Sequence, residues 1–254
     1  MPNTTGLDPS QIDAAVFDIG GVFLIRHWEP ICSGMLRGGY EIDPDPELFH
    51  AAHYNAVRAL SNHLHGEINE SSRDFWSHFE RGYLSHLGVD ADRIEHAVET
   101  MFTEVFGKEP HPIWRYTLDA NIEAFRRIAD AGVPVAIVTN NDGTAARQLI
   151  DFGICQVGDG PLTSVAAIAD SGEMGIAKPD PRIFTPALEA LGVEPHRALY
   201  VGDTVHADVF GARAAGMPVI HLDPYELFGG FDHHRLPDVA AVADFLSVPR
   251  PRNV

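Results

Sequence analysis

Cysteine is scarce in this chain, and long hydrophobic runs are missing. Only Cys32 and Cys155 occur among 254 residues, in different segments and without CxxC spacing, so a structural disulfide is not expected. No run reaches the roughly 18 apolar residues that a membrane-spanning helix needs. The polar segment Met1–Pro9 has no basic-then-apolar signal pattern. These absences favour a cytoplasmic protein without a membrane partner.

Basic residues are also few. The chain has 18 Lys and Arg against 36 Asp and Glu, which gives a formal net charge of -18. This balance argues against a nucleic-acid partner, because nucleic acids bind basic surfaces. An anionic substrate would need a metal ion or a lysine to offset the overall field. With 45% hydrophobic residues, the chain should still fold around a packed core, as one large domain or two small ones. The sequence does not indicate an oligomeric state.

Several short apolar runs, each followed by polar residues, predict buried parallel strands, because they show little alternation. They are Ala14–Phe17, Val133–Val138, Ala198–Val201 and Met217–Leu222. Helical patterns alternate with these runs, and a glycine comes directly after each helical pattern, as at many helix ends. They cover Ala120–Ala131, Thr144–Phe152, Pro181–Leu191 and Ala207–Ala215. Alternation of strand and helix predicts an α/β fold with a Rossmann-like, doubly wound parallel sheet.

Residues 28–114 interrupt this alternation. They contain no buried-strand run and are rich in His, acidic and aromatic residues. Amphipathic patterns predict helices over Asp45–Leu60, Ser71–Leu87 and Ala91–Phe106, and Pro110 and Pro112 mark the return of the chain. We therefore expect a core of residues 1–27 and 115–254 with an inserted all-helical domain over 28–114.

Polar residues whose side chains could take part in catalysis or binding follow the predicted strands. Three carboxylates gathered at one edge would repel one another unless a cation lay between them, and oxygen ligands suit Mg²⁺. A lysine, a hydroxyl, an amide and exposed N–H groups could bind phosphate oxygens. An aspartate beside them could act as a nucleophile on phosphorus. The residues concerned are Asp18, Thr139, Asn140, Lys178, Asp203 and Asp208. Each alone could be a helix cap, a turn or a surface residue, but their consistent order after strand-like segments favours a site.

Four segments carry a resemblance to a known family. Phe17–Val22, Val138–Asn141, Ser171–Phe184 and Val201–Met217 resemble the four motifs of the haloacid dehalogenase superfamily, the last two closely. The resemblance covers roughly residues 13 to 246. In that family the insertion after the first motif is a cap over the active site. Gly66–Asn69, followed by Phe75 and Trp76, is similar to a phosphatase branch that includes sugar-1-phosphate phosphatases and the N-terminal domain of soluble epoxide hydrolases.

The resemblance implies a role for each site residue. Asp18 would be the nucleophile, with Lys178 as its catalytic and phosphate-binding partner. Ile19, Gly20, Thr139 and Asn140 would also bind phosphate. Asp18, Asp203 and the backbone carbonyl of Gly20 would hold Mg²⁺, and Asp208 would bind the ion or orient a water on it. The expected activity is Mg²⁺-dependent hydrolysis of a small phosphorylated metabolite.

Position 20 departs from the family pattern. Phosphatases of this family carry a second Asp there as general acid and base, and Gly20 cannot do this. Loss of a general acid costs about 10²–10⁴ in rate. A good leaving group could depart unaided, a residue of the insertion could donate the proton, or the protein could have lost most of its activity.

Two rival functions stay open. A 2-haloacid dehalogenase would use the same nucleophile on carbon without a metal, although such enzymes have an aromatic residue and a threonine where Gly20 and Val22 stand. A regulatory protein could keep the scaffold after losing the acid. Metal dependence distinguishes the phosphatase from the dehalogenase. Trapping of a phosphoenzyme would favour an enzyme over a regulatory protein.

Other noticeable residues are given simpler interpretations. His50 and His53 lie three residues apart, but without neighbouring Cys or acidic ligands they do not indicate zinc. Nine further His, Trp and Glu residues are interpreted as solvated, loop, packing or helix-start positions, and Glu67 is also a candidate to face the site. They are His63, His65, His78, His233, His234, Trp28, Trp76, Trp114 and Glu67.

Overall fold

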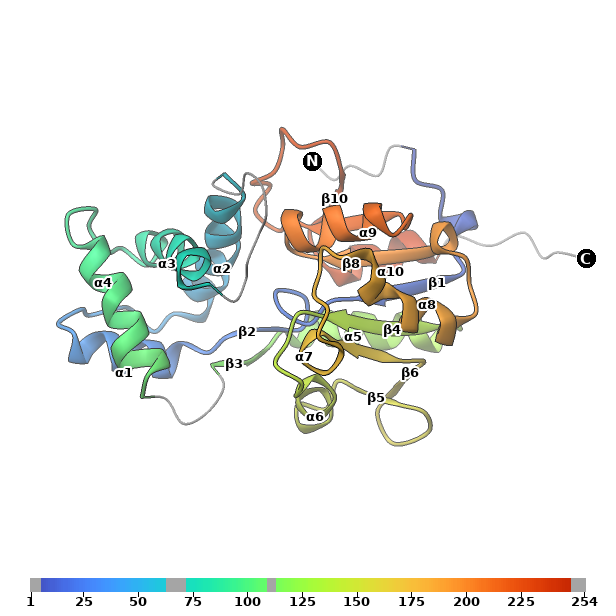
Figure 1. The fold of residues 1–254 in the computed structure, drawn as a ribbon, viewed down its shortest axis with the longest axis horizontal. Coiled ribbons are helices and arrows are strands. Elements are labelled where there is room, and N and C mark those ends of the chain that lie inside the picture. Colours follow the sequence, from blue (N-terminus) through green and yellow to red (C-terminus); the bar gives the residue numbers. More distant parts are fainter. Residues whose placement is uncertain (1–5, 63–71, 109–112, 248–254) are drawn as a thin grey trace, which may run out of the picture. The chain divides into compact units, whose positions relative to one another are not determined.

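A computed structural model describes residues 6–62, 72–108 and 113–247. Contacts divide the chain into two units (Figure 1). The core unit comprises Met1–Phe23 and Thr117–Val254, and the insert unit comprises Leu24–Tyr116. No helix in the described parts of the chain is long and apolar enough to cross a membrane. Cys32 and Cys155 are both free.

The core unit is built on a six-stranded sheet with the order β10-β9-β8-β1-β4-β7. Every strand pair recorded in this sheet is parallel. Its central strands are buried along their whole length, as uninterrupted apolar runs require. They are β1 (Ala14–Phe17), β4 (Val135–Thr139), β8 (Ala198–Gly202) and β9 (Val219–Leu222). The α/β fold class predicted from the sequence is confirmed.

The order of strands creates a switch point at β1. After β1 the chain continues to β4 on one side, and later returns to β8 on the other side. Ligands of open α/β sheets bind beyond the carboxyl ends of the strands at such a point. The loops after β1, β4 and β8 therefore meet where ligand binding is expected.

Helices flank this sheet. Helix α5 packs against α10, and α8 contacts β4 and β7. The regular helices of the core unit are α5 (Asp119–Asp130), α6 (Ala145–Asp151), α7 (Ser171–Met174), α8 (Thr185–Leu191), α9 (Phe210–Ala214) and α10 (Val239–Leu246). Short 3₁₀ turns cover Pro9–Gln11, Pro181–Phe184 and Pro195–Arg197, and a π-helical turn covers Val205–Val209.

The short strands of the core unit were not anticipated. Edge strands β7 (Ile168–Asp170) and β10 (His234–Leu236) complete the main sheet, and β5 (Cys155–Val157) pairs with β6 (Thr163–Val165) in a separate ribbon. Each has only three residues, which is too short for a periodic pattern. The interpretation of His233 and His234 as loop residues was wrong for His234, which begins β10, whereas His233 is a buried residue just before that strand.

The insert unit consists of helices and two short strands. Its helices are α1 (Trp28–Arg37), α2 (Pro46–Ser61), α3 (Arg73–His86) and α4 (Ile94–Thr100), and α4 continues into a π-helical segment, Met101–Phe106. Strands β2 (Leu24–Arg26) and β3 (Trp114–Thr117) pair where the chain enters and leaves the unit. Helix α1, capped by the His27 side chain, had no counterpart among the predicted helices.

Candidate active site

The loop after β1 places Asp18 at the edge of the sheet. The Asp18 N–H donates to the Val201 carbonyl on β8 (3.0 Å), which fixes the end of the strand. The Ile19 carbonyl then accepts from the N–H groups of Val22 and Phe23, at 3.2 and 2.8 Å. This turn needs Gly21, whose φ of 64° lies in the left-handed region. Gly20 lies outside that region, so its backbone conformation is open to other residues.

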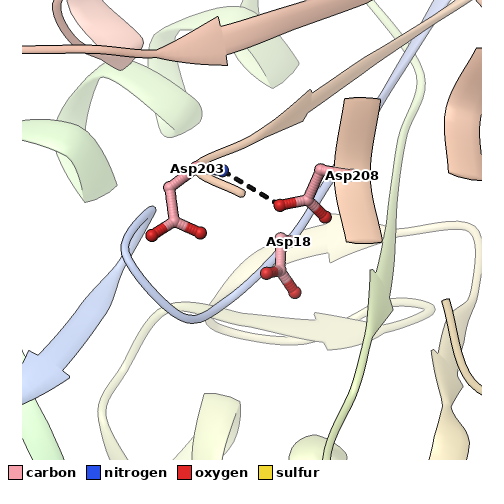
Figure 2. A group of neighbouring side chains, drawn as sticks. All are labelled: Asp18, Asp203 and Asp208. Carbon is pink, nitrogen blue, oxygen red and sulfur yellow. Dashed lines mark hydrogen bonds between the residues drawn. The ribbon is translucent and has the colours of Figure 1, made fainter. Parts of the chain in front are cut away.

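Three carboxylates meet at this edge (Figure 2). Asp18 comes from the loop after β1, and Asp203 and Asp208 come from the segment after β8. One oxygen from each lies within 4.8 Å of the others. All three residues are buried, with exposed fractions of 8%, 2% and 0%. Among the described residues, this is the only group of acidic, His or Cys side chains with the spacing of a metal site.

Asp208 is saturated with hydrogen-bond donors. Its Oδ1 accepts from Lys178 Nζ (2.7 Å) and lies 2.9 Å from the Tyr200 hydroxyl. Its Oδ2 accepts from the Asp203 N–H (3.1 Å), the Thr204 N–H (2.8 Å) and the Thr204 hydroxyl (2.7 Å). Asp208 thus holds the turn that presents Asp203. The close approach also requires Gly202, because a Cβ there would lie 2.3 Å from Asp208 Cγ.

Lys178 supplies the positive charge of the cluster. Its ammonium lies 3.0 Å from Asp18 Oδ1 and donates to Asp208 Oδ1 and to the Tyr200 hydroxyl, the latter at 2.9 Å. Its backbone is held by Asn140, whose Oδ1 accepts from the Lys178 N–H (2.7 Å) and whose Nδ2 donates to the Lys178 carbonyl (3.0 Å). The Asn140 side chain therefore joins the loop after β4 to the lysine loop.

The electrostatics follow from an excess of buried negative charge. Burial raises the pKa of Asp18 to about 7, with Asp208 and Asp203 adding to the rise and Lys178 opposing it. Burial and the Asp208 charge raise the pKa of Asp203 well above its ordinary value. Burial alone would raise the pKa of Asp208, but Lys178 and the hydrogen bonds from Thr204 outweigh burial and hold this pKa below that of an ordinary aspartate. One ammonium does not balance three carboxylates.

The other residues predicted for the site lie on the same loops. Thr139 ends β4 and is 3% exposed, and Ile19 and Gly20 follow Asp18 directly. The structure thus brings Asp18, Asp203, Asp208 and Lys178 into contact. The Asn140 side chain, for which phosphate binding stays a prediction, is hydrogen-bonded to the Lys178 backbone.

Several supporting residues were missed by sequence reasoning. Asp170, at the end of β7, accepts from the N–H groups of Gly143, Ala145 and Gly172 and so organises the loop after β4. His221 Nε2 lies 2.5 Å from the Asp203 carbonyl, and its Nδ1 lies 2.8 Å from His233 Nε2. Burial lowers the pKa of His221 to about 4 and that of His233 to about 3, which keeps both rings neutral near pH 7. The only signal in the sequence was the presence of polar residues such as Asp170 and His221 within or at the end of apolar runs.

In the insert unit, His53 is buried against the rings of Tyr54, Phe79 and Trp114. Trp28 stacks on His27, and Trp76 packs on Phe79. The segment Gly66–Asn69, with Glu67, and residues His63 and His65 lie outside the described residues.

A family model for haloacid dehalogenase-like hydrolases matches residues 12–216, which is most of the chain. This chain belongs to that family. The human haloacid dehalogenase-like hydrolase domain-containing protein 3 is 32% identical over 215 residues, covering 82% of this chain and 80% of that protein. The phosphoserine phosphatase of Thermus thermophilus is 40% identical over 143 residues. That match covers 56% of this chain and 52% of the relative, so the chain spans about half its length.

Solved structures show the same fold. The hydrolase YfnB of Bacillus subtilis, bound to magnesium, aligns with a TM-score of 0.56 over 93% of this chain and 99% of that chain, at 14% identity. This member of the haloacid dehalogenase-like family therefore has the α/β core of these structures, and the residue cluster above occupies the switch point of that core.

Proposed function

We propose that this protein is a Mg²⁺-dependent phosphatase that hydrolyses a small phosphomonoester through an aspartyl-phosphate on Asp18. The observation that carries the proposal is the buried group of Asp18, Asp203 and Asp208 around a single lysine. Relatives that are named phosphatases, among them the phosphoserine phosphatase, support the choice of phosphorus over carbon as the reacting atom.

The donor set fits Mg²⁺. The ion prefers oxygen ligands and is often bound by one or two carboxylates together with a substrate phosphate. Asp18, Asp203 and the Gly20 carbonyl would hold it, and it would supply positive charge for the phosphoryl oxygens. Asp208 would act through the Asp203 turn and Lys178, because both its oxygens already accept hydrogen bonds.

In the first step an Asp18 oxygen attacks phosphorus, and the bond between phosphorus and the ester oxygen breaks. The alcohol oxygen leaves with the electron pair of that bond. In the second step water attacks the aspartyl-phosphate, inorganic phosphate departs, and the carboxylate is restored. Lys178 and Thr139 would bind the phosphoryl oxygens, and Asn140 would keep the Lys178 loop in place. The insert unit would act as the cap that selects the substrate.

Gly20 limits this chemistry. With no acid at position 20, the leaving oxygen takes its proton from solvent or from a residue of the insertion, and the attacking water lacks a base there. We therefore expect a steep dependence of rate on the basicity of the leaving group, with aryl, acyl and anomeric sugar phosphates ahead of simple alkyl phosphates.

A metal experiment tests the proposal. Hydrolysis of p-nitrophenyl phosphate and of a panel of phosphorylated metabolites should stop in excess chelator and return with Mg²⁺. Added Mg²⁺ should also raise the melting temperature of the wild-type protein and not that of Asp203→Asn, because a bound ion stabilises the folded state. Full activity in chelator would contradict the metal requirement. Chelator-resistant release of halide from a 2-haloacid would favour the dehalogenase. Failure to hydrolyse any phosphoester would refute the phosphatase.

A further inference from the structure

Tyr200 lies at the centre of the buried cluster, although it carries no negative charge. It is the third residue of β8 and is 0% exposed. Its hydroxyl accepts a hydrogen bond from Lys178 Nζ at 2.9 Å. The same oxygen lies 3.0 Å from the Val138 carbonyl and 2.9 Å from Asp208 Oδ1. One hydroxyl thus joins the end of β4, the lysine loop and the segment after β8.

The number of protons on the Lys178 ammonium shows what the hydrogen bond to Tyr200 can do. An ammonium has three protons and no acceptor. Two are donated to Asp208 and Tyr200. These two hydrogen bonds fix the position of the ammonium, and that position places Nζ 3.0 Å from Asp18 Oδ1 as an ion pair.

We propose that Tyr200 is a positioning residue that aims the Lys178 ammonium at Asp18 and at the phosphoryl group in the reaction proposed above. The inference rests on that proposed function. The hydroxyl touches neither the nucleophile nor the substrate, and acts only through Lys178. Because Lys178 keeps its charge and two carboxylate partners when the hydroxyl is removed, the loss affects orientation rather than charge.

The variant Tyr200→Phe isolates the hydroxyl. The ring, packed edge-on against Phe184 at 5.1 Å between centroids, stays in place. A small misplacement of a catalytic group costs on the order of 10²-fold in rate. We expect kcat for p-nitrophenyl phosphate with saturating Mg²⁺ to fall about 10- to 100-fold while KM changes less than about threefold.

Tyr83→Phe is the matched control. Tyr83 lies in α3 of the insert unit, is also 0% exposed, and its hydroxyl has no hydrogen-bond partner among the described residues. The same atom is removed from an equally buried ring, but no contact with Lys178 is lost. Tyr83→Phe should keep the wild-type kcat.

A double-mutant cycle separates positioning from a purely structural role. If Tyr200 acts through Lys178, Tyr200→Phe should add almost nothing to the loss already caused by Lys178→Met. An equal further loss in that background, a kcat like that of Tyr83→Phe, or failure of Tyr200→Phe to fold would overturn the inference. If the wild-type protein itself fails to hydrolyse phosphoesters with Mg²⁺, the proposed function is what fails.

Discussion

Each unit buries a cluster of charged side chains, and the two clusters differ in their balance of charge. In the insert unit, Arg26 and Glu80 form a buried ion pair, with Nη1 to Oε2 at 2.9 Å and Nη2 to Oε1 at 2.8 Å. Both side chains are almost fully buried, at 2% and 0% exposed. In the core unit, Lys178 pairs with Asp18 and Asp208, and the carboxylate of Asp203 lies beside them.

The surroundings differ as well. Aromatic rings enclose the Arg26 guanidinium, with centroids 4.6 to 5.5 Å away. These rings stabilise the guanidinium through their π faces, and the Glu80 carboxylate neutralises its charge. They belong to Trp76, Phe79, Tyr83, Phe106 and Trp114.

Charge balance distinguishes a structural charge cluster from a functional one. A buried ion pair that is enclosed by side chains needs no ligand to balance its charge. Removing one partner of such a pair should reduce stability. A cluster with surplus charge of one sign at a switch point is incomplete, and removing one member should damage function instead.

The largest contrast is expected at Asp18. Asp18→Asn keeps the shape of the side chain but makes a poor nucleophile, so kcat should fall at least about 10³-fold. Because one of the surplus charges is removed, the melting temperature should not decrease. Asp13→Asn is the control: Asp13 precedes β1 at its other end and pairs there with Arg197. It should keep full activity, and near-normal turnover by Asp18→Asn would refute the covalent mechanism.

A large loss of stability is expected at Glu80. Glu80→Gln leaves Arg26 buried without its counter-charge, which should lower the free energy of unfolding by about 3–5 kcal/mol. The matched variant is Glu95→Gln, which breaks the exposed Arg81–Glu95 pair of the same unit, at 2.7 and 2.9 Å, and should cost far less stability because water screens both charges.

Urea denaturation of both variants measures the difference. The double variant Arg26→Met with Glu80→Leu should recover part of the loss, because it removes both charges together. Equal effects of the two Glu→Gln changes would show that burial of the Arg26–Glu80 pair does not matter.

A smaller effect is expected at Gly20, where Gly20→Asp increases the charge surplus of the core. Its backbone lies outside the left-handed region, so the side chain meets no conformational penalty of that kind. The new acid should raise kcat/KM for alkyl phosphates by about 10²-fold and flatten the dependence on leaving-group basicity. A graded series of phosphoesters measures this on both proteins. A flat series in the wild-type protein would show that another residue already supplies the proton.

The central strands and the charged members of the site could be predicted because their signals are local. Apolar runs that end in Asp18, Thr139 or Asp203 specify both a buried parallel strand and the edge where its last residue lies. The three-residue strands β7 and β10 could not be predicted, since periodicity needs more residues than they contain.

The supporting contacts were hidden for a different reason. Tyr200 stands in an apolar run and reads as core packing, while the partners of its hydroxyl include Lys178, 22 residues away, and Val138, 62 residues away. Asn140 shows an amide beside a predicted phosphate site, but its partner is a backbone 38 residues later. Such roles depend on the tertiary fold.

The covalent role of Asp18 can be measured directly. The wild-type protein should be mixed with Mg²⁺ and p-nitrophenyl phosphate, quenched in acid during turnover, digested and examined by mass spectrometry. We predict the mass of one phosphoryl group on Asp18 itself, accumulating because no base at Gly20 assists its hydrolysis, and no such adduct in Asp18→Asn. Steady turnover with Asp18 unmodified, or a phosphoryl group on another residue, would show that Asp18 is not the nucleophile.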